Sequence, residues 1–212
     1  MNDTAPSATK DAAKLRRSIG RIGLEVMIGF IGVYAAFALN AYHERRELAD
    51  RRRQVKLALI AEIVPLTELS RRNIGGYASV LAAFDSGVKA GRKPIPHPFT
   101  EPIGLNMHIW EATKQAGGLS LFDVPTFAAV ADFYNDISRM LAIYGQLREL
   151  SIGVILPGAD RGADAFYDAR SGILRADIRR LYYWDLNALE NISKQTARQG
   201  DQLIKRLAHD TL

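Results

Sequence analysis

The 212-residue chain contains no cysteine, which excludes disulfide bonds, thiolate metal sites and cysteine nucleophiles, and which suits an oxidising compartment. It also lacks the glycine-rich phosphate loops of nucleotide-binding enzymes, the G-x-S-x-G turn of serine hydrolases and the H-E-x-x-H pattern of zinc proteases. Its four histidines are scattered along the chain, and no two of them have the spacing of metal ligands. We therefore expect a non-enzymatic protein that holds no metal and no other cofactor.

The most informative feature that is present is an apolar stretch from Ile22 to Tyr42. As a helix, its 21 residues would span about 31 Å, close to the hydrocarbon thickness of a bilayer. Only Glu25 and Asn40 interrupt it, each within about one turn of an end, where a polar side chain reaches the membrane interface. We predict a transmembrane helix at residues 21–42, with a buried helix of a soluble domain as the alternative.

The flanks of this segment bear on its orientation. Residues 1–20 are polar and basic, and we expect a partly disordered tail there. No secretory cleavage site accompanies the apolar segment, which favours an uncleaved signal anchor. Positive charge is nearly balanced on the two sides, but a short basic tail is hard to translocate, whereas long domains cross largely regardless of charge. We predict a cytoplasmic N-terminus and an extracytoplasmic domain at residues 43–212, with the reverse orientation as the alternative.

The anchor also carries a pattern of small and polar residues. Five of them recur at spacings of three and four, which places them on one side of a helix: Glu25, Gly29, Gly32, Ala36 and Asn40. Small residues let a second helix approach closely, and the two polar side chains could hydrogen-bond across the contact. We predict a helix-packing face here. The alternative is that Gly and Ala are simply common in membrane helices.

Helical signals continue through the rest of the chain. No helix breaker precedes Pro65, so we expect the anchor to continue into a long helix that kinks at this proline and is interrupted at Gly75–Gly76. Four prolines then predict an extended surface loop at about 91–104. Asp123 is the predicted N-cap of a helix that Pro157–Gly158 stops.

Two apolar stripes predict how the later helices pack. The first steps by three and four residues from Phe127 to Leu147, and the second runs from Leu174 to Ile192 and on to Leu207. No alternating strand pattern competes with them. The predicted fold is therefore all-α: an N-terminal transmembrane helix that continues into a long helix, followed by an antiparallel helical bundle.

Two aromatic groups are candidate contact sites. Trp110 with Glu111, close to the proline-rich loop, is a candidate partner contact, and the alternative is a core tryptophan that closes the end of the bundle. Tyr182, Tyr183 and Trp184 lie near several arginines, a pattern that suits nucleic acid or acidic lipid but is common on plain bundles. Much of the net charge of +5 lies beside the anchor, where it meets lipid headgroups. We expect the lipid bilayer, and no nucleic acid, as a partner.

Two sequence patterns carry a family resemblance. The anchor reads E-x6-G-V-x2-A-F-x2-N-x-Y-x-E-R from Glu25 to Arg45, and a W-x6-G-x-L segment runs from Trp110 to Leu119, ahead of a helix that contains Tyr134. In both patterns the chain resembles a broad group of uncharacterised bacterial single-span membrane proteins. The resemblance implies an anchor helix and a helical extramembrane domain at the bacterial inner membrane. It implies no activity.

Two functions fit these features. We predict a non-enzymatic single-pass membrane protein, an accessory or scaffolding subunit that associates with itself or with other membrane-protein subunits. The alternative is an extracytoplasmic helical sensor or binding module for a small or lipidic ligand. A filled core with apolar residues left exposed would favour the scaffold. A cavity lined by four aromatic residues would favour the sensor: Trp110, Phe122, Tyr134 and Tyr144.

Overall fold

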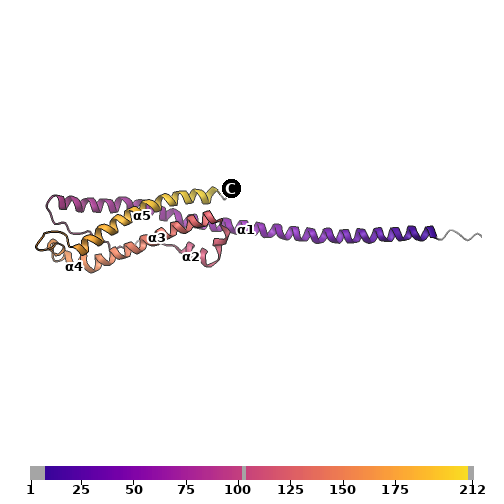
Figure 1. Ribbon diagram of the computed structural model, residues 1–212, viewed down its shortest axis with the longest axis horizontal. Helices are drawn as coiled ribbons and strands as arrows, with labels where there is room; N and C mark the ends of the chain where they lie inside the picture. Colours follow the sequence, from indigo (N-terminus) through magenta and orange to yellow (C-terminus); the bar gives the residue numbers. More distant parts are fainter. Residues whose placement is uncertain (1–7, 102–103, 210–212) are drawn as a thin grey trace, which may run out of the picture. The chain divides into compact units, whose positions relative to one another are not determined.

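The structure is a computed structural model that describes the backbone of residues 8–101 and 104–209, and side chains from Met27 onward within those ranges, Ile28 excepted. Its regular elements are helices (Figure 1): α1 Ala8–Lys89, α2 His108–Gln115, α3 Val124–Leu150, α4 Leu156–Ala159 and α5 Ala176–His209. Short helical turns at Gly118–Leu121, Ser151–Ile155 and Ala163–Phe166 accompany them. Over the described residues, the only strand-like pairing is an isolated bridge between Tyr167 and Leu174. The all-α prediction is confirmed for this part of the chain.

The chain divides into two compact units, residues 1–51 and 52–212. In the first unit the backbone is helical from Ala8 onward, so residues 8–20 of the predicted tail are part of α1. Residues 1–7 of that tail lie outside the described residues.

The long helix predicted after the anchor is present, but the predicted break in it is wrong. α1 passes Pro65 and runs through Gly75–Gly76 without interruption to Lys89. Its inner face in the second unit is buried in the core, and this burial outweighs the cost of a glycine inside a helix, about 1 kcal/mol each. The helix ends where Gly91 takes a left-handed conformation with φ of 72°, which a glycine adopts without strain.

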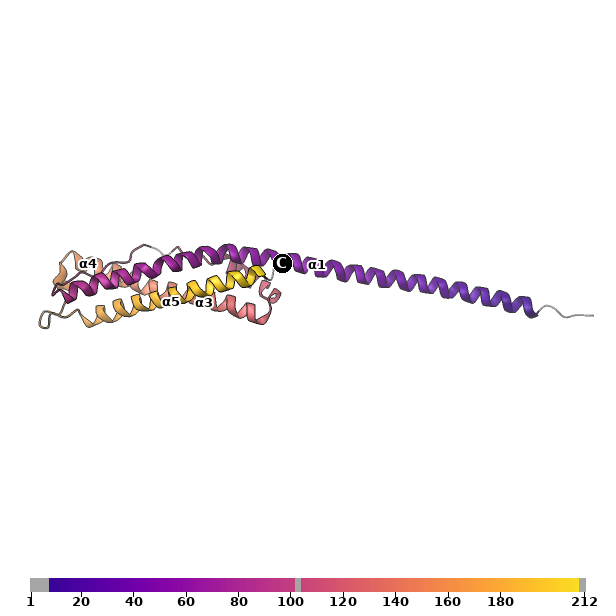
Figure 2. The same cartoon turned by 90° about the horizontal axis from the view of Figure 1, so that it is seen from above.

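In the second unit, α1 and α5 lie side by side and run in opposite directions (Figures 1 and 2). Near the end of α1, the Asp85 carboxylate accepts a hydrogen bond of 2.6 Å from the Tyr183 hydroxyl at the start of α5. Earlier in α1, Arg71 donates to the Asp201 carboxylate, toward the end of α5, at 2.9 Å. Residue numbers therefore fall along one helix as they rise along the other.

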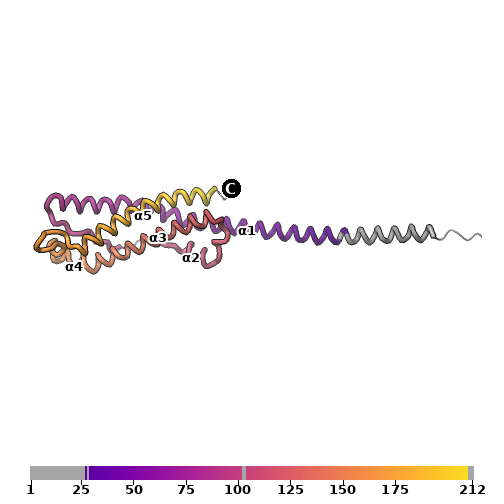
Figure 3. The backbone as a smooth tube through the Cα atoms, in the orientation of Figure 1, coloured from indigo at the N-terminus to yellow at the C-terminus, as the bar shows by residue number. Residues whose placement is uncertain are grey.

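α3 is antiparallel to α5 as well, and so it is parallel to α1. The Gln195 side chain donates to Asp136 at 2.7 Å, and the Arg206 guanidinium donates to the Pro125 carbonyl, near the start of α3, at 3.0 Å. The prediction of an antiparallel bundle is thus correct for α5 against its two neighbours. The α1–α3 pair is parallel, because the chain between them returns along the length of the bundle (Figure 3).

The proline-rich segment makes this return, and its contacts record the path. The His97 amide donates to the Tyr182 hydroxyl at 2.9 Å, the Phe99 amide donates to the Ser151 hydroxyl at 2.9 Å, and further along the Tyr144 hydroxyl donates to the Glu101 carbonyl at 2.6 Å. Pro96 in this segment and Leu105 directly after it are buried. The predicted surface loop is extended, but it lies partly inside the bundle, because its apolar side chains pack against the helices.

The predicted stripes form most of the core. Along α3 the stripe from Val130 to Leu147 is buried apart from Leu141, which is half-buried, whereas Phe127 at its start is exposed. Along α5 the exposed position is Leu181. The predicted cap is present: the Asp123 side chain accepts a hydrogen bond of 2.7 Å from the Thr126 amide. The predicted stop is displaced, because α3 ends at Leu150 and helical turns continue past Pro157 to Ala159.

Candidate functional site

The first candidate surface is the apolar segment of α1 in the first unit. Phe30 is 76% exposed, and the large apolar side chains around it are similarly uncovered. Successive residues of a helix point about 100° apart, so consecutive exposed residues surround the whole helix. The exposed set is Met27, Phe30, Ile31, Val33, Tyr34, Phe37, Leu39 and Tyr42.

The predicted packing face lies on this segment. Gly29, Gly32, Ala36 and Asn40 are helical and exposed, and a Cβ atom added at either glycine would meet nothing within 4 Å. The Asn40 amide donates to the Glu44 carboxylate one turn later at 2.7 Å, so its hydrogen bond here is local. The fifth member of the face, Glu25, has a side chain outside the described residues.

Among the helical residues with described positions, no stretch is both long and apolar enough to span a membrane. The predicted transmembrane segment at residues 21–42 begins before the first described side chain, Met27.

The second candidate, Trp110 with Glu111, lies where α2 meets α1 and α3. Glu62 of α1 holds this junction together: its carboxylate accepts hydrogen bonds from the Ile109 amide at 2.8 Å, the Trp110 amide at 3.0 Å and the Tyr134 hydroxyl at 2.6 Å. The N-cap residue of α2 supplies no side-chain hydrogen bond. Glu62 therefore satisfies the free amides at the start of α2 from another helix, and its negative charge suits the helix dipole there.

Trp110 itself belongs to the core. It is 8% exposed, and its ring stacks on Tyr134 with centroids 4.7 Å apart and planes 3° apart. Glu111 is exposed and pairs with Lys114 at 2.8 Å, while the Lys114 ammonium lies 5.3 Å from the Trp110 ring centroid. Burial, and then the hydrogen bond to Glu62, raises the pKa of the Tyr134 hydroxyl well above its usual range. The structure thus brings Trp110 into the bundle and leaves Glu111 on the surface.

Sequence reasoning missed a cavity where α1 ends and α5 begins. Its volume is about 620 Å³, and its walls come from α1, the residues that follow α1, the turn before α5 and the first turns of α5. We call it the bundle-end cavity. Phe84, Tyr167 and Leu174 form its buried apolar floor, and basic side chains are also part of its lining. No sequence signal marks it, because its walls are far apart along the chain.

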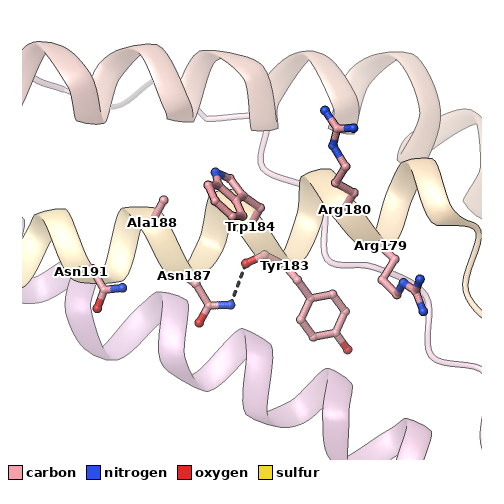
Figure 4. Close-up of a pocket in the computed structure, with 7 residues that line it drawn as sticks. All are labelled: Arg179, Arg180, Tyr183, Trp184, Asn187, Ala188 and Asn191. Carbon is pink, nitrogen blue, oxygen red and sulfur yellow. Dashed lines mark hydrogen bonds between the residues drawn. The ribbon is translucent and has the colours of Figure 1, made fainter.

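The aromatic group on α5 is divided between core and surface. Tyr182 is buried, whereas Trp184 is 75% exposed and borders a hollow of about 460 Å³ whose seven lining residues all belong to α5 (Figure 4). A hollow made by one helix is a shallow groove. In the figure, Arg179 and Arg180 leave the helix in different directions, and only Arg179 also lines the bundle-end cavity.

One buried carboxylate in α5 has no role in these contacts. Asp185 is 3% exposed, its Oδ2 atom has no hydrogen-bond partner, and burial raises the pKa of its carboxyl. Within the described ranges, no three His, Asp or Glu side chains gather as metal ligands would.

Comparison with known proteins adds no relative: no family model, no curated protein and no solved structure matches the chain.

Proposed function

We propose that the chain is a non-enzymatic single-pass membrane protein, an accessory or scaffolding subunit that associates with itself or with other membrane-protein subunits. In this proposal the anchor lies in a bacterial inner membrane, with a cytoplasmic N-terminus and an extracytoplasmic helical domain. The observation that carries it is the apolar surface that surrounds α1 between Met27 and Tyr42.

The energetic argument rests on the size of that surface. Burying one large apolar side chain is worth about 1.5–3 kcal/mol, so covering the eight exposed ones is worth on the order of 10 kcal/mol. A helix that is apolar on every side is typical of a membrane span or of a helix buried among others. Lipid, joined by a second helix at the glycine-containing side, is the cover that we propose.

The packing around four aromatic residues named above favours a scaffold over a sensor that binds its ligand among them. The four aromatic side chains whose cavity would have indicated a sensor are all buried, and two of them stack directly on each other: Trp110, Phe122, Tyr134 and Tyr144. Apolar residues are left exposed on α1 instead. This combination supports association with lipid or protein partners.

Membrane retention tests the anchor. The full chain should stay in the membrane fraction through carbonate and high-salt washes, because an apolar helix does not leave lipid when charges are screened. Phe37→Arg should weaken retention, since a charge at the centre of a span costs about 2.5–3.5 kcal/mol. Leu48→Arg, at an exposed position later in α1, is the matched control and should be retained like the parent. Release of the parent by salt alone would overturn the proposal.

Helix association tests the partner role. Gly32→Leu should weaken crosslinking between anchors in the membrane, because the added side chain keeps a second backbone from close approach. Val33→Leu, one residue away on another side of the helix, should have little effect. Equal association of the parent and both variants would show that the anchor face has no role in assembly.

Reporter fusions after Leu212 test the orientation. A reporter that matures only outside the cytoplasm should be active, and one that requires the cytoplasm should be silent. The reverse pattern would place the domain in the cytoplasm.

A further inference from the structure

We propose that the bundle-end cavity is a binding site for an amphipathic anion, a molecule with an apolar chain and a carboxylate or phosphate head. This inference is independent of the scaffold role, since it concerns only residues 84–183 of the second unit. The cavity volume of about 620 Å³ lies within the usual range of ligand sites, roughly 300–1,000 Å³.

The apolar part of the ligand is indicated by the floor and the rim. Phe84 is buried at the bottom, while Val88 and Ile173 are exposed at the opening, so apolar surface leads from solvent into the cavity. An acyl or alkyl chain that covered these two side chains would remove apolar area from water, which is favourable.

The anionic head is indicated by the charges. Three cations line the cavity, Arg92, Lys93 and Arg179, and no carboxylate lines it. Lys93 is already paired with Asp164 at 2.6 Å. Neither guanidinium has an acidic partner within the described part of the chain, so both are available to a carboxylate or phosphate, which they match with paired N–H donors.

Neighbouring acidic groups cancel only part of this charge. The Asp85 carboxylate accepts the hydrogen bond from the Tyr183 hydroxyl at 2.6 Å, and the Asp164 carboxylate accepts the one from Lys93. Both carboxylates keep their negative charge, so the three cations exceed them by one, and an anion at the opening faces two arginines that have no acidic partner in the described part of the chain.

The walls are held in place without a ligand. The Tyr167 hydroxyl donates to the Pro94 carbonyl at 2.8 Å, which ties the turn before α5 to the segment after α1. The turn is closed by the Asp168 amide, which donates to the Ile173 carbonyl at 2.8 Å, while the Asp168 carboxylate accepts from the Ser171 amide at 2.8 Å. A preformed site loses little conformational entropy on binding.

Photolabelling of the full chain in lipid nanodiscs tests this site. A diazirine-bearing dodecanoate should label peptides within residues 84–93 and 167–183, and mass spectrometry maps the adducts. Unlabelled octanoate and octyl phosphate should compete, whereas octylamine, which shares the chain, and inorganic phosphate, which shares the head, should not. The stronger competitor of the first two distinguishes a fatty acid from a phospholipid as the source of the ligand.

Two matched pairs of variants locate the label. Val88→Trp should fill the opening and abolish labelling. Val64→Trp should leave labelling unchanged; Val64 lies on the same helix and is 41% exposed, close to the 44% of Val88. Arg179→Gln should weaken competition by octanoate about fivefold, as for a solvent-exposed ion pair, and Arg180→Gln should leave it unchanged. Equal competition by octylamine, or labelling that survives Val88→Trp, would overturn the proposal. If Val88→Trp fails to fold, equal competition curves for the two arginine variants would overturn it instead.

Discussion

The Glu62 junction provides the sharpest test of how the second unit is held together. Glu62 accepts three hydrogen bonds from groups that lie 47, 48 and 72 residues away along the chain. Glu62→Ala should remove all three and leave amides at the start of α2 and the Tyr134 hydroxyl without an acceptor. Tyr134→Phe should remove only the bond to the hydroxyl.

The magnitudes follow from charge and burial. A hydrogen bond to a charged group contributes about 1.5–3 kcal/mol. Because Glu62 is half-buried, we take the lower end for each bond. The free energy of unfolding should fall by about 1.5 kcal/mol in Tyr134→Phe and by about 4.5 kcal/mol in Glu62→Ala, which removes three such bonds. The double variant should lose about 1.5 kcal/mol less than the sum, since both single changes remove the same bond.

Urea unfolding of the full chain measures these changes. The chain has two tryptophans, and Trp184→Phe would leave Trp110, stacked on Tyr134, as the reporter of the junction. Glu68→Ala is the matched control on α1, because the Glu68 carboxylate is exposed and pairs with Arg71 at the surface. Such a pair contributes about 0–1 kcal/mol. Equal losses of unfolding free energy for Glu62→Ala and Glu68→Ala would refute the reasoning. So would a double variant whose loss equals the sum of the losses in Glu62→Ala and Tyr134→Phe.

Three further predictions concern the stability of the second unit. A Cβ atom at Gly200 would lie 2.0 Å from the Thr67 hydroxyl, so Gly200→Ala should lower the free energy of unfolding by about 1–3 kcal/mol in urea titrations. Gly145→Ala, where a Cβ atom would meet nothing within 4 Å, should not lower it. Burial raises the pKa of the Asp185 carboxyl above its value in the unfolded chain. The stability that the protonated carboxyl contributes at low pH is therefore lost as pH rises through the folded pKa. Asp185→Asn should unfold at a higher urea concentration than the parent at pH 7, but not at pH 3. The pKa of Tyr134 is also raised, so stability should decline as pH rises above about 10, and Tyr134→Phe should reduce this decline in alkaline denaturation curves.

Several features of the fold could be predicted from the sequence because their causes are local. Asp123 caps α3 through an amide only three residues away, and the stripe from Val130 to Leu147 recurs at helical spacing. Both signals lie within one helix. The expectation that α1 would break at Gly75–Gly76 was wrong because local propensity is weaker than the burial of a long inner face.

The candidate sites divide in the same way. The apolar run and its small-residue pattern can be read from the sequence because they are contiguous, and their role as a membrane anchor stays a prediction. The core alternative for Trp110 could be stated but not decided. Stacking on Tyr134, 24 residues later, places this tryptophan in the core. The sequence offered no sign that Glu62 is its neighbour.

The sequence by itself determined where α3 begins and which faces of α3 and α5 are apolar, because capping and helical periodicity act over three or four residues. Only the tertiary structure decided that α1 and α3 are parallel, that Glu62 joins three helices, and that a basic-rimmed cavity forms where α1 ends and α5 begins. These features depend on the path of the proline-rich segment along the bundle. That path is set by packing between residues far apart in the chain, and no local pattern encodes such contacts.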